Sequence, residues 1–130
     1  MSNHQVLIVE DEENLGITLS EYLNDKNYQA HLAQTCQEAR EIFNSQEKYP
    51  TIVLMDIGLP DGDGIELANE FRALRQDFVL LFLSAQNDPE TKLKGLEMGA
   101  EDYITKPFDL REIIFRLNKA IKIHGLLSNY

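Results

Sequence analysis

Short runs of apolar residues alternate along the chain with longer stretches in which apolar residues recur every three or four positions. The short runs predict β-strands at residues 5–10, 28–33, 51–55, 78–84 and 102–105. The run at 51–55 is apolar almost throughout, as expected of a strand that is buried on both faces, whereas the run at 28–33 is more polar and fits a sheet edge. Each run is followed by a stretch with helical periodicity, the first of which covers residues 13–26.

The starts of the other predicted helices are marked by capping residues. In three places a threonine or aspartate precedes a glutamate by three residues, which is the pattern of a capping box. The pairs are Thr35 and Glu38, Asp63 and Glu66, and Asp109 and Glu112. Asp88 followed by Pro89 marks a fourth start, because proline is favoured at the first helical position. Five strands alternating with five helices predict an α/β fold with one parallel sheet, covered on both faces through right-handed crossovers.

Polar side chains gather at the ends of four predicted strands, where ligands bind in an open parallel sheet. Glu10 and Asp11 end the first strand, Asp56 follows the third, Ser84 ends the fourth and Lys106 follows the fifth. Three carboxylates beside one lysine leave about two uncompensated negative charges, and like charges at close range disfavour joint ionisation. A divalent cation cancels this excess, and carboxylate oxygens suit magnesium.

A carboxylate flanked by a metal ion can attack a phosphoryl group, and Asp56 is placed to be that nucleophile. Magnesium and Lys106 would neutralise the phosphoryl oxygens, the Ser84 hydroxyl would bond another, and the Gly58 carbonyl can turn toward the metal without side-chain hindrance. Each feature is common alone: residues 10–13 also fit an acidic first helical turn. The prediction depends on their occurring together and in order.

Four segments resemble the signature blocks of the response regulator receiver domain of two-component signalling. They are LIVEDEE (7–13), VLMDIGLPDGDG (53–64), LFLSAQ (81–86) and GAEDYITKPF (99–108). The resemblance covers roughly residues 5–123 and implies a flavodoxin-like, doubly wound sheet of five parallel strands in the order 2-1-3-4-5, with five helices. It implies a receiver domain at residues 1–123, with 124–130 as a tail or the start of a linker.

The resemblance also implies the roles of the matching residues at the strand ends. Asp56 corresponds to the phosphoacceptor and Asp11 to the direct Mg2+ ligand, with Glu10 assisting through water. The Gly58 carbonyl corresponds to the third protein ligand of the metal, and Lys106 to the lysine that pairs with the phosphoryl group.

Further positions match the switch and loop residues of the family. Ser84 matches the switch hydroxyl and Tyr103 the switch aromatic residue. Pro107 follows what the family makes a cis peptide, and Gly64 fits the turn glycine. Gln86, like Gly58, occupies a position that varies in the family and tunes the lifetime of the phosphoryl group.

A second surface resembles the dimer face of receiver domains attached to winged-helix DNA-binding domains. Its apolar patch would consist of Leu93, Leu96 and Ile114. Its ion pairs would join Lys92 with Glu112 and Asp102 with Arg116. Glu101 lacks the usual basic partner, because that position is Ile123, so one pair of the ring is missing.

The chain is therefore predicted to be a phosphorylation-dependent switch rather than an enzyme. A sensor histidine kinase would supply the phosphoryl group, and the face formed by the fourth helix, fifth strand and fifth helix would change and form a homodimer. If the chain is part of a longer protein, control of transcription is expected. The residues after 123 are too few for an effector domain, so a single-domain receiver that acts by binding another protein stays open. The histidines at 4, 31 and 124 are predicted to be surface residues without a phosphodonor role.

Other functions fit the sequence less well. A haloacid-dehalogenase-like phosphatase also uses a strand-end aspartate with magnesium, but it needs a second aspartate where Gly58 stands. A calcium loop that starts at Asp61 would have Ile65 at a ligand position and Glu66 at its obligatory glycine. A dinucleotide-binding fold would need a glycine-rich turn after the first strand.

Composition narrows the partners and the compartment. The net charge of −10 argues against nucleic-acid binding through this chain, since clustered basic residues are absent. Cys36 is the only cysteine, which excludes an intrachain disulfide and a thiolate zinc site. The first residues lack the features of a signal peptide, and no apolar run is long enough to span a membrane, so we expect a cytoplasmic protein.

Overall fold

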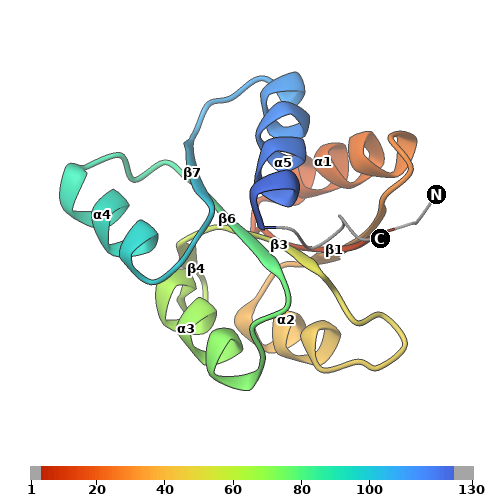
Figure 1. Cartoon of the computed structure of the whole chain (residues 1–130), viewed down its shortest axis with the longest axis horizontal. Helices are drawn as coiled ribbons and strands as arrows, with labels where there is room; N and C mark the ends of the chain where they lie inside the picture. Colours follow the sequence, from red (N-terminus) through yellow and green to blue (C-terminus); the bar gives the residue numbers. More distant parts are fainter. Residues whose placement is uncertain (1–3, 125–130) are drawn as a thin grey trace.

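The structure, a computed structural model that describes residues 4–124, contains a five-stranded parallel sheet with helices on both faces (Figure 1). Its strands are β1 (Gln5–Val9), β2 (Gln29–Ala33), β3 (Ile52–Met55), β6 (Val79–Ser84) and β7 (Asp102–Thr105). They lie in the order β2-β1-β3-β6-β7, and each neighbouring pair is parallel. Counted along the chain, this order is 2-1-3-4-5, so the predicted flavodoxin-like, doubly wound topology is confirmed.

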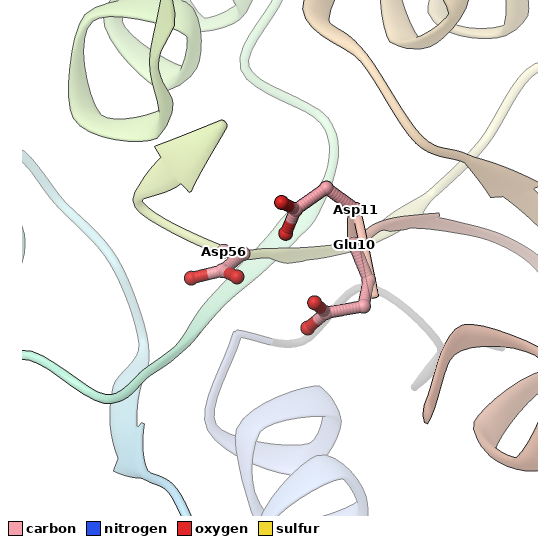
Figure 2. A group of neighbouring side chains, drawn as sticks. All are labelled: Glu10, Asp11 and Asp56. Carbon is pink, nitrogen blue, oxygen red and sulfur yellow. The ribbon is translucent and has the colours of Figure 1, made fainter. Parts of the chain in front are cut away.

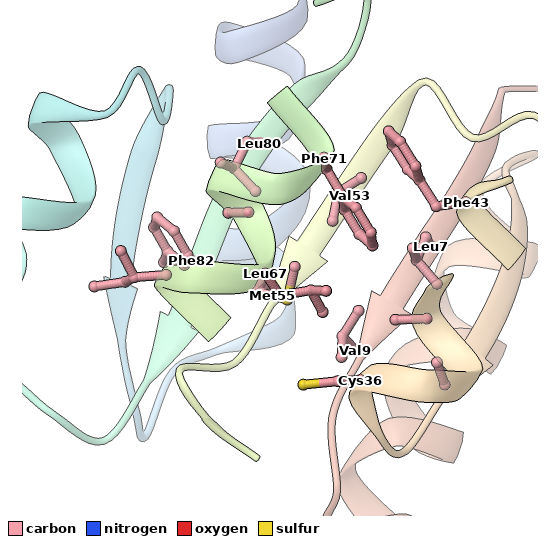
Figure 3. Packing of buried hydrophobic residues seen from close by; sticks show 14 of the residues in the cluster. Leu7, Val9, Cys36, Phe43, Val53, Met55, Leu67, Phe71, Leu80 and Phe82 are labelled. Atoms are coloured by element: carbon pink, nitrogen blue, oxygen red, sulfur yellow. The ribbon is translucent and has the colours of Figure 1, made fainter. Parts of the chain in front are cut away.

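Five helices cover the sheet and divide the core into two clusters. They are α1 (Glu13–Asp25), α2 (Cys36–Phe43), α3 (Gly64–Leu74), α4 (Pro89–Glu97) and α5 (Leu110–His124). Successive residues of a strand point to opposite faces. Val6 and Ile8 of β1 therefore pack under α1 and α5, whereas Leu7 and Val9 pack under α2 and α3 (Figure 3). Burial of both faces explains why β3 is apolar throughout and β6 is apolar up to its last residue, Ser84.

The capping residues predicted from the sequence start their helices. The Thr35 hydroxyl accepts a hydrogen bond from the Glu38 amide at 3.1 Å. The carboxylates of Asp63, Asp88 and Asp109 likewise accept hydrogen bonds from backbone amides in the first turns of α3, α4 and α5. The reciprocal half of the capping box is absent at α5, because Glu112 pairs with Arg116 instead. At α2 the Glu38 carboxylate accepts from the Gln34 amide, one residue before the cap.

The sequence pattern did not predict a small hairpin directly after β3. Its strands, β4 (Gly58–Leu59) and β5 (Gly62–Asp63), pair antiparallel. Two-residue strands rich in glycine have no apolar alternation, so the segment has the composition of a loop.

At the other end of the chain, α5 continues through His124, one residue past the predicted domain boundary at 123. The rest of the predicted tail, 125–130, lies outside the described residues, as do residues 1–3. From residue 4 to 124, none of the helices has both the length and the apolar character needed to cross a membrane.

Candidate functional site

The strand ends named from the sequence converge at one edge of the sheet. Glu10 directly follows β1, and Asp56 directly follows β3. Val9 and Met55 are paired in register, which brings the next residue of each strand to the same edge. Ser84, the last residue of β6, is paired with Thr105, so Lys106 follows at the same level. Parallel pairing therefore assembles residues that are up to 96 positions apart in the chain, from 10 to 106.

Three carboxylates form the acidic part of this site. One oxygen from each of Glu10, Asp11 and Asp56 lies within 4.8 Å of the others (Figure 2). Glu10 is 1% exposed and Asp56 6% exposed, whereas Asp11 is open to solvent. Buried carboxylates at this range are costly unless positive charge compensates them. Because the donors are all carboxylate oxygens, the group fits a hard divalent cation such as magnesium.

Lys106 supplies the only positive charge in contact with these carboxylates among residues 4–124. Its Nζ lies 2.7 Å from Glu10 Oε1 and 3.1 Å from Asp56 Oδ2. Burial raises the pKa of Glu10, and the contact with Lys106 only partly opposes this shift. Burial alone would lower the pKa of Lys106, but the contacts with Glu10 and Asp56 outweigh it and raise that pKa. One ammonium group therefore stays charged beside three carboxylates, and the site keeps a net negative charge.

The segment that carries Asp56 is held by backbone contacts. The Asp56 amide donates to the Val9 carbonyl at 2.9 Å, and Asp56 Oδ1 accepts from the Ile57 amide at 2.7 Å. A Cβ at Gly64 would lie 2.0 Å from the Asp56 carbonyl oxygen, so only glycine fits at that position. The close approach explains the turn glycine predicted from the resemblance. The peptide bond between Lys106 and Pro107 is cis, as expected.

Ser84 and Tyr103 are linked through one residue, Gln86. Ser84 is fully buried, and its Oγ accepts from the Gln86 amide at 3.1 Å. The Tyr103 hydroxyl donates to the carbonyl oxygen of the same Gln86. Tyr103 is 6% exposed, so its ring already points inward, and burial raises its pKa.

The predicted dimer face is only partly laid out as the sequence suggested. Leu93 and Leu96 are exposed on α4, but Ile114 packs against the core cluster under α1 and α5. Its neighbour Phe115 is 69% exposed, and α5 also presents Ile123 to solvent, at 72%. Ile114 lies on the same side of α5 as the buried Leu117, whereas Phe115 lies outside the buried stripe. The resemblance to the family's dimer face, rather than helical periodicity, is what assigned Ile114 to that face.

Three of the four charged residues of this face form ion pairs within the chain, and the fourth, Lys92, lies over an aromatic ring. Arg116 lies 2.9 Å from Asp102 and 3.0 Å from Glu112. Lys92 Nζ lies 5.9 Å from the centre of the Tyr103 ring.

Glu101 also has basic partners inside the chain, although position 123 is isoleucine. Its carboxylate lies 3.4 Å from Arg72 and 3.5 Å from His124, and it accepts from the Leu80 amide. His124 was predicted to be a surface residue, but its side chain is only 21% exposed.

Sequence reasoning missed the contact that Asp61 makes with the start of α2. Its carboxylate accepts from the amides of Cys36 and Gln37, which begin α2. The two segments are 24 and 25 positions apart, so no local pattern points to the contact. An aspartate inside a glycine-rich turn is otherwise expected simply to favour the turn.

Comparison with known proteins agrees with this architecture. Residues 6–118 match the family model described as the response regulator receiver domain. The chain is 39% identical to the transcriptional regulatory protein RprY of Bacteroides fragilis over 118 residues, and 35% identical to SrrA of Staphylococcus aureus over 122 residues. These alignments cover 91% and 94% of this chain but 49% of each relative. The chain thus spans about half the length of the curated relatives it matches.

Solved structures give the same result. The receiver domain of HemR from Leptospira biflexa superposes with a TM-score of 0.84 at 38% identity, covering 92% of this chain and 94% of that one. A CheY-like receiver domain from Methanospirillum hungatei superposes with a TM-score of 0.87 at 26% identity, covering 95% and 98%. The matching fold, the family model over most of the chain and the relatives at 35–39% identity agree. This chain belongs to the response regulator receiver domain family of two-component systems.

Proposed function

We propose that this chain is a phosphorylation-dependent switch of the cytoplasm, in which Asp56 accepts a phosphoryl group from a phosphohistidine of a sensor histidine kinase. The observation that carries this proposal is the grouping of three carboxylates, within 4.8 Å of one another, around a lysine that contacts Asp56. The excess negative charge favours a cation, and the strand-end carboxylate is a nucleophile beside it.

The residues of the site have different roles in the proposed phosphoryl transfer. Glu10, Asp11, Asp56 and the Gly58 carbonyl would hold Mg2+, which supplies positive charge to the phosphoryl oxygens when bound. An Asp56 oxygen forms a bond to phosphorus while the bond from phosphorus to the imidazole nitrogen breaks, and the electron pair stays with the imidazole. Lys106 stays paired with the new phosphoryl oxygens. The same residues would support hydrolysis of the product, so the chain promotes its own chemistry without turning over a free substrate.

The hydrogen bonds that Gln86 makes with Ser84 and Tyr103 can couple phosphorylation of Asp56 to a change at the surface near Tyr103. A phosphoryl oxygen on Asp56 offers the Ser84 hydroxyl a strong acceptor. If Ser84 moves toward it, the bond from the Gln86 amide to Ser84 Oγ is lost, and the Gln86 carbonyl that holds Tyr103 moves with it. A preference of a few kcal/mol between two existing conformers is enough to shift the population.

The output we propose is a homodimer through the face formed by α4, β7 and α5. Leu93 and Leu96 leave large apolar side chains exposed there, and Arg116 and Asp102 can exchange their partners between two copies. The relatives RprY and SrrA are called transcriptional regulatory proteins, and both are about twice as long as the aligned segment. If this chain is joined to an effector domain, dimerisation would control transcription.

Phosphorylation with a small donor tests the central assignment. Incubated with Mg2+ and acetyl phosphate, the protein should gain the mass of one phosphoryl group, labile at alkaline pH. Asp56→Asn should gain none, while Asp25→Asn, an equal change of an exposed aspartate at the end of α1, should behave like the wild type. An undiminished mass gain in Asp56→Asn would exclude Asp56 as the acceptor.

A further inference from the structure

The hairpin formed by β4 and β5 is the segment that would present the Gly58 carbonyl to the metal. It pairs Gly58 with Asp63 and Leu59 with Gly62. Its base is closed next to Asp56, because the Gly64 amide donates to the carbonyl of the following residue, Ile57, at 2.7 Å. Two paired residues on each side are too few to hold a hairpin by themselves. The position of Gly58 therefore depends on what holds the tip.

The tip is bound to the start of α2 by the Asp61 carboxylate. Its Oδ1 accepts from the Cys36 amide at 2.7 Å, and its Oδ2 accepts from the Gln37 amide at 3.2 Å. These are the first two amides of α2, which have no acceptor within their own helix. A negative charge at a helix N-terminus is also favoured by the helix dipole. The hydrogen bond from the Cys36 amide is the main cause that lowers the pKa of Asp61.

The next residue of the tip packs against the same point. A Cβ at Gly62 would lie 2.9 Å from Cys36 Sγ, so the backbone of the tip lies directly over that side chain. Cys36 is 2% exposed and belongs to the core under α2 and α3. The tip is therefore fixed to a residue of α2 that is itself fixed in the core.

We propose that Asp61 is a positioning residue for the metal site, which fixes the hairpin so that the Gly58 carbonyl meets the carboxylates of Glu10, Asp11 and Asp56. Asp61 does not touch the metal; it acts through the hairpin. This inference rests on the Mg2+ site of the proposed function. Residues that orient metal ligands from outside the coordination shell commonly change metal affinity by a factor of about 10–100. Because Asp61 acts through a hairpin rather than on a ligand directly, we expect about a three- to tenfold loss of affinity.

A Mg2+ titration of four proteins tests this role, with 1H–15N NMR of the Gly58 amide as the readout. Asp61→Ala removes both acceptors and should raise the Kd for Mg2+ by about three- to tenfold. Asp61→Asn keeps one acceptor oxygen and should lie between Asp61→Ala and the wild type. Thr35→Ala is the matched control, because the Thr35 hydroxyl caps the same helix by accepting from the Glu38 amide, within α2 rather than from the hairpin. It should weaken α2 yet leave the Kd within about twofold.

The outcomes separate the inference from the function on which it rests. A wild type that does not bind Mg2+ at Gly58 would overturn the proposed metal site and the role of Asp61 together. A wild type that binds, with Asp61→Ala unchanged, would overturn the role of Asp61 alone. Equal losses in Asp61→Ala and Thr35→Ala would also overturn it, because both would then act through the stability of α2. Unfolding of each variant by urea should confirm that all four are folded during the titration.

Discussion

The two ends of the same sheet differ in how far their charged side chains are compensated by other groups of the protein. At the carboxyl ends of the strands, one ammonium group faces three carboxylates, and the protein does not neutralise the difference. At the amino ends, two arginines are surrounded by acceptors and aromatic rings of the protein itself. Both ends bring together charged side chains from distant segments, yet only one leaves charge for a ligand.

At the amino end, the guanidinium groups of the two arginines find most of their hydrogen-bond partners within the chain itself. Arg72 donates to the carbonyl oxygens of Phe78 at 2.8 Å and Gly99 at 2.9 Å, and it stacks 4.2 Å from the centre of the Phe78 ring. Arg75 lies between the rings of Phe43 and Tyr49, at 4.3 and 4.1 Å. Planar guanidinium groups suit such sites, because they combine several donors with stacking.

The comparison gives a criterion for interpreting buried charge. A saturated cluster such as the one around Arg72 has no coordination left for another molecule, so its contribution is to stability. A cluster with a net charge and a solvent-exposed member, such as Asp11, has capacity to bind. The ion pairs at the two ends have similar distances, so distance alone would not separate them. The balance of charge does.

The largest effect is expected at Asp11, the exposed carboxylate of the site. Beryllofluoride mimics a phosphoryl group on an aspartate and should bind when Mg2+ is held beside Asp56. Asp11→Ala removes one of the three carboxylate ligands and should weaken Mg2+ binding by about tenfold or more, so that beryllofluoride binding is lost at moderate Mg2+. The measurement is a titration followed by 19F NMR.

Glu12→Ala is the control, since Glu12 is the next residue in the same acidic run but contributes no oxygen to the group of three. It should bind Mg2+ within about twofold of the wild type. Equal losses in the two variants would mean that the run acts as diffuse negative charge at a helix start rather than as a ligand set.

A stability effect without a binding effect is expected at the amino end. Arg72→Ala leaves the Phe78 and Gly99 carbonyls without this donor. It also takes the arginine from Glu101, which keeps the Leu80 amide and His124 as partners. The change should lower the free energy of unfolding by about 2–3 kcal/mol. Urea denaturation measures the loss, and Mg2+ affinity should stay within about twofold. Arg111→Ala, at an arginine whose side chain is 84% exposed, should leave the urea midpoint nearly unchanged. A large loss of Mg2+ affinity in Arg72→Ala would show that the two ends are coupled.

The carboxyl end was predictable from the sequence, and the amino end was not. Glu10, Asp56 and Lys106 could be found because each directly follows an apolar run, and parallel strands end at one edge. Arg72 could not be found, because its acceptors are backbone carbonyls, which any residue type provides.

Two other misses have related causes. Asp61 was missed because its partners are amides of a helix 24 and 25 positions away. Ile114 stays a predicted residue of the dimer face; what the resemblance missed is its partial burial against the core under α1 and α5, because family spacing does not show how deeply a helical residue packs. Local sequence patterns thus identify polar residues at the ends of strands and helices, whereas contacts with the backbone of distant segments can be found only from the structure.

A smaller effect is expected at the proposed dimer face. Activated by beryllofluoride, the wild type should shift toward a dimer in sedimentation velocity. Arg116→Glu replaces the partner of Asp102 with a like charge, in both copies of a symmetric interface, and should remain a monomer. Arg111→Glu makes the same charge change at an exposed site of α5 and should still dimerise. A wild type that stays monomeric when activated would favour a receiver that signals by binding another protein.

The smallest effect at neutral pH is expected from the thiol of Cys36, which lies at the carboxyl ends of the strands beneath the hairpin tip. Burial, followed by the hydrogen bond and charge of Asp61, raises the pKa of its thiol from 9.0 to about 11. Well below pH 9 both the folded and the unfolded chain keep the thiol protonated, so its ionisation has no effect on stability there. Between pH 9 and 11 the unfolded chain loses this proton first, so the thiol's contribution to stability falls as the pH rises.

The charge of Asp61 makes this thiol a probe of the hairpin tip. Asp61→Asn removes the charge and should lower the pKa of Cys36 only part of the way toward 9.0, because burial, the main cause that raises it, would remain. The 13Cβ chemical shift of Cys36 between pH 8 and 11.5 measures the midpoint, because it follows ionisation at that residue alone. Thr35→Ala should leave the midpoint unchanged. Midpoints near 9.0 in both the wild type and Asp61→Asn would mean that the tip does not cover the thiol, and the anchoring of the hairpin through α2 would lose its support.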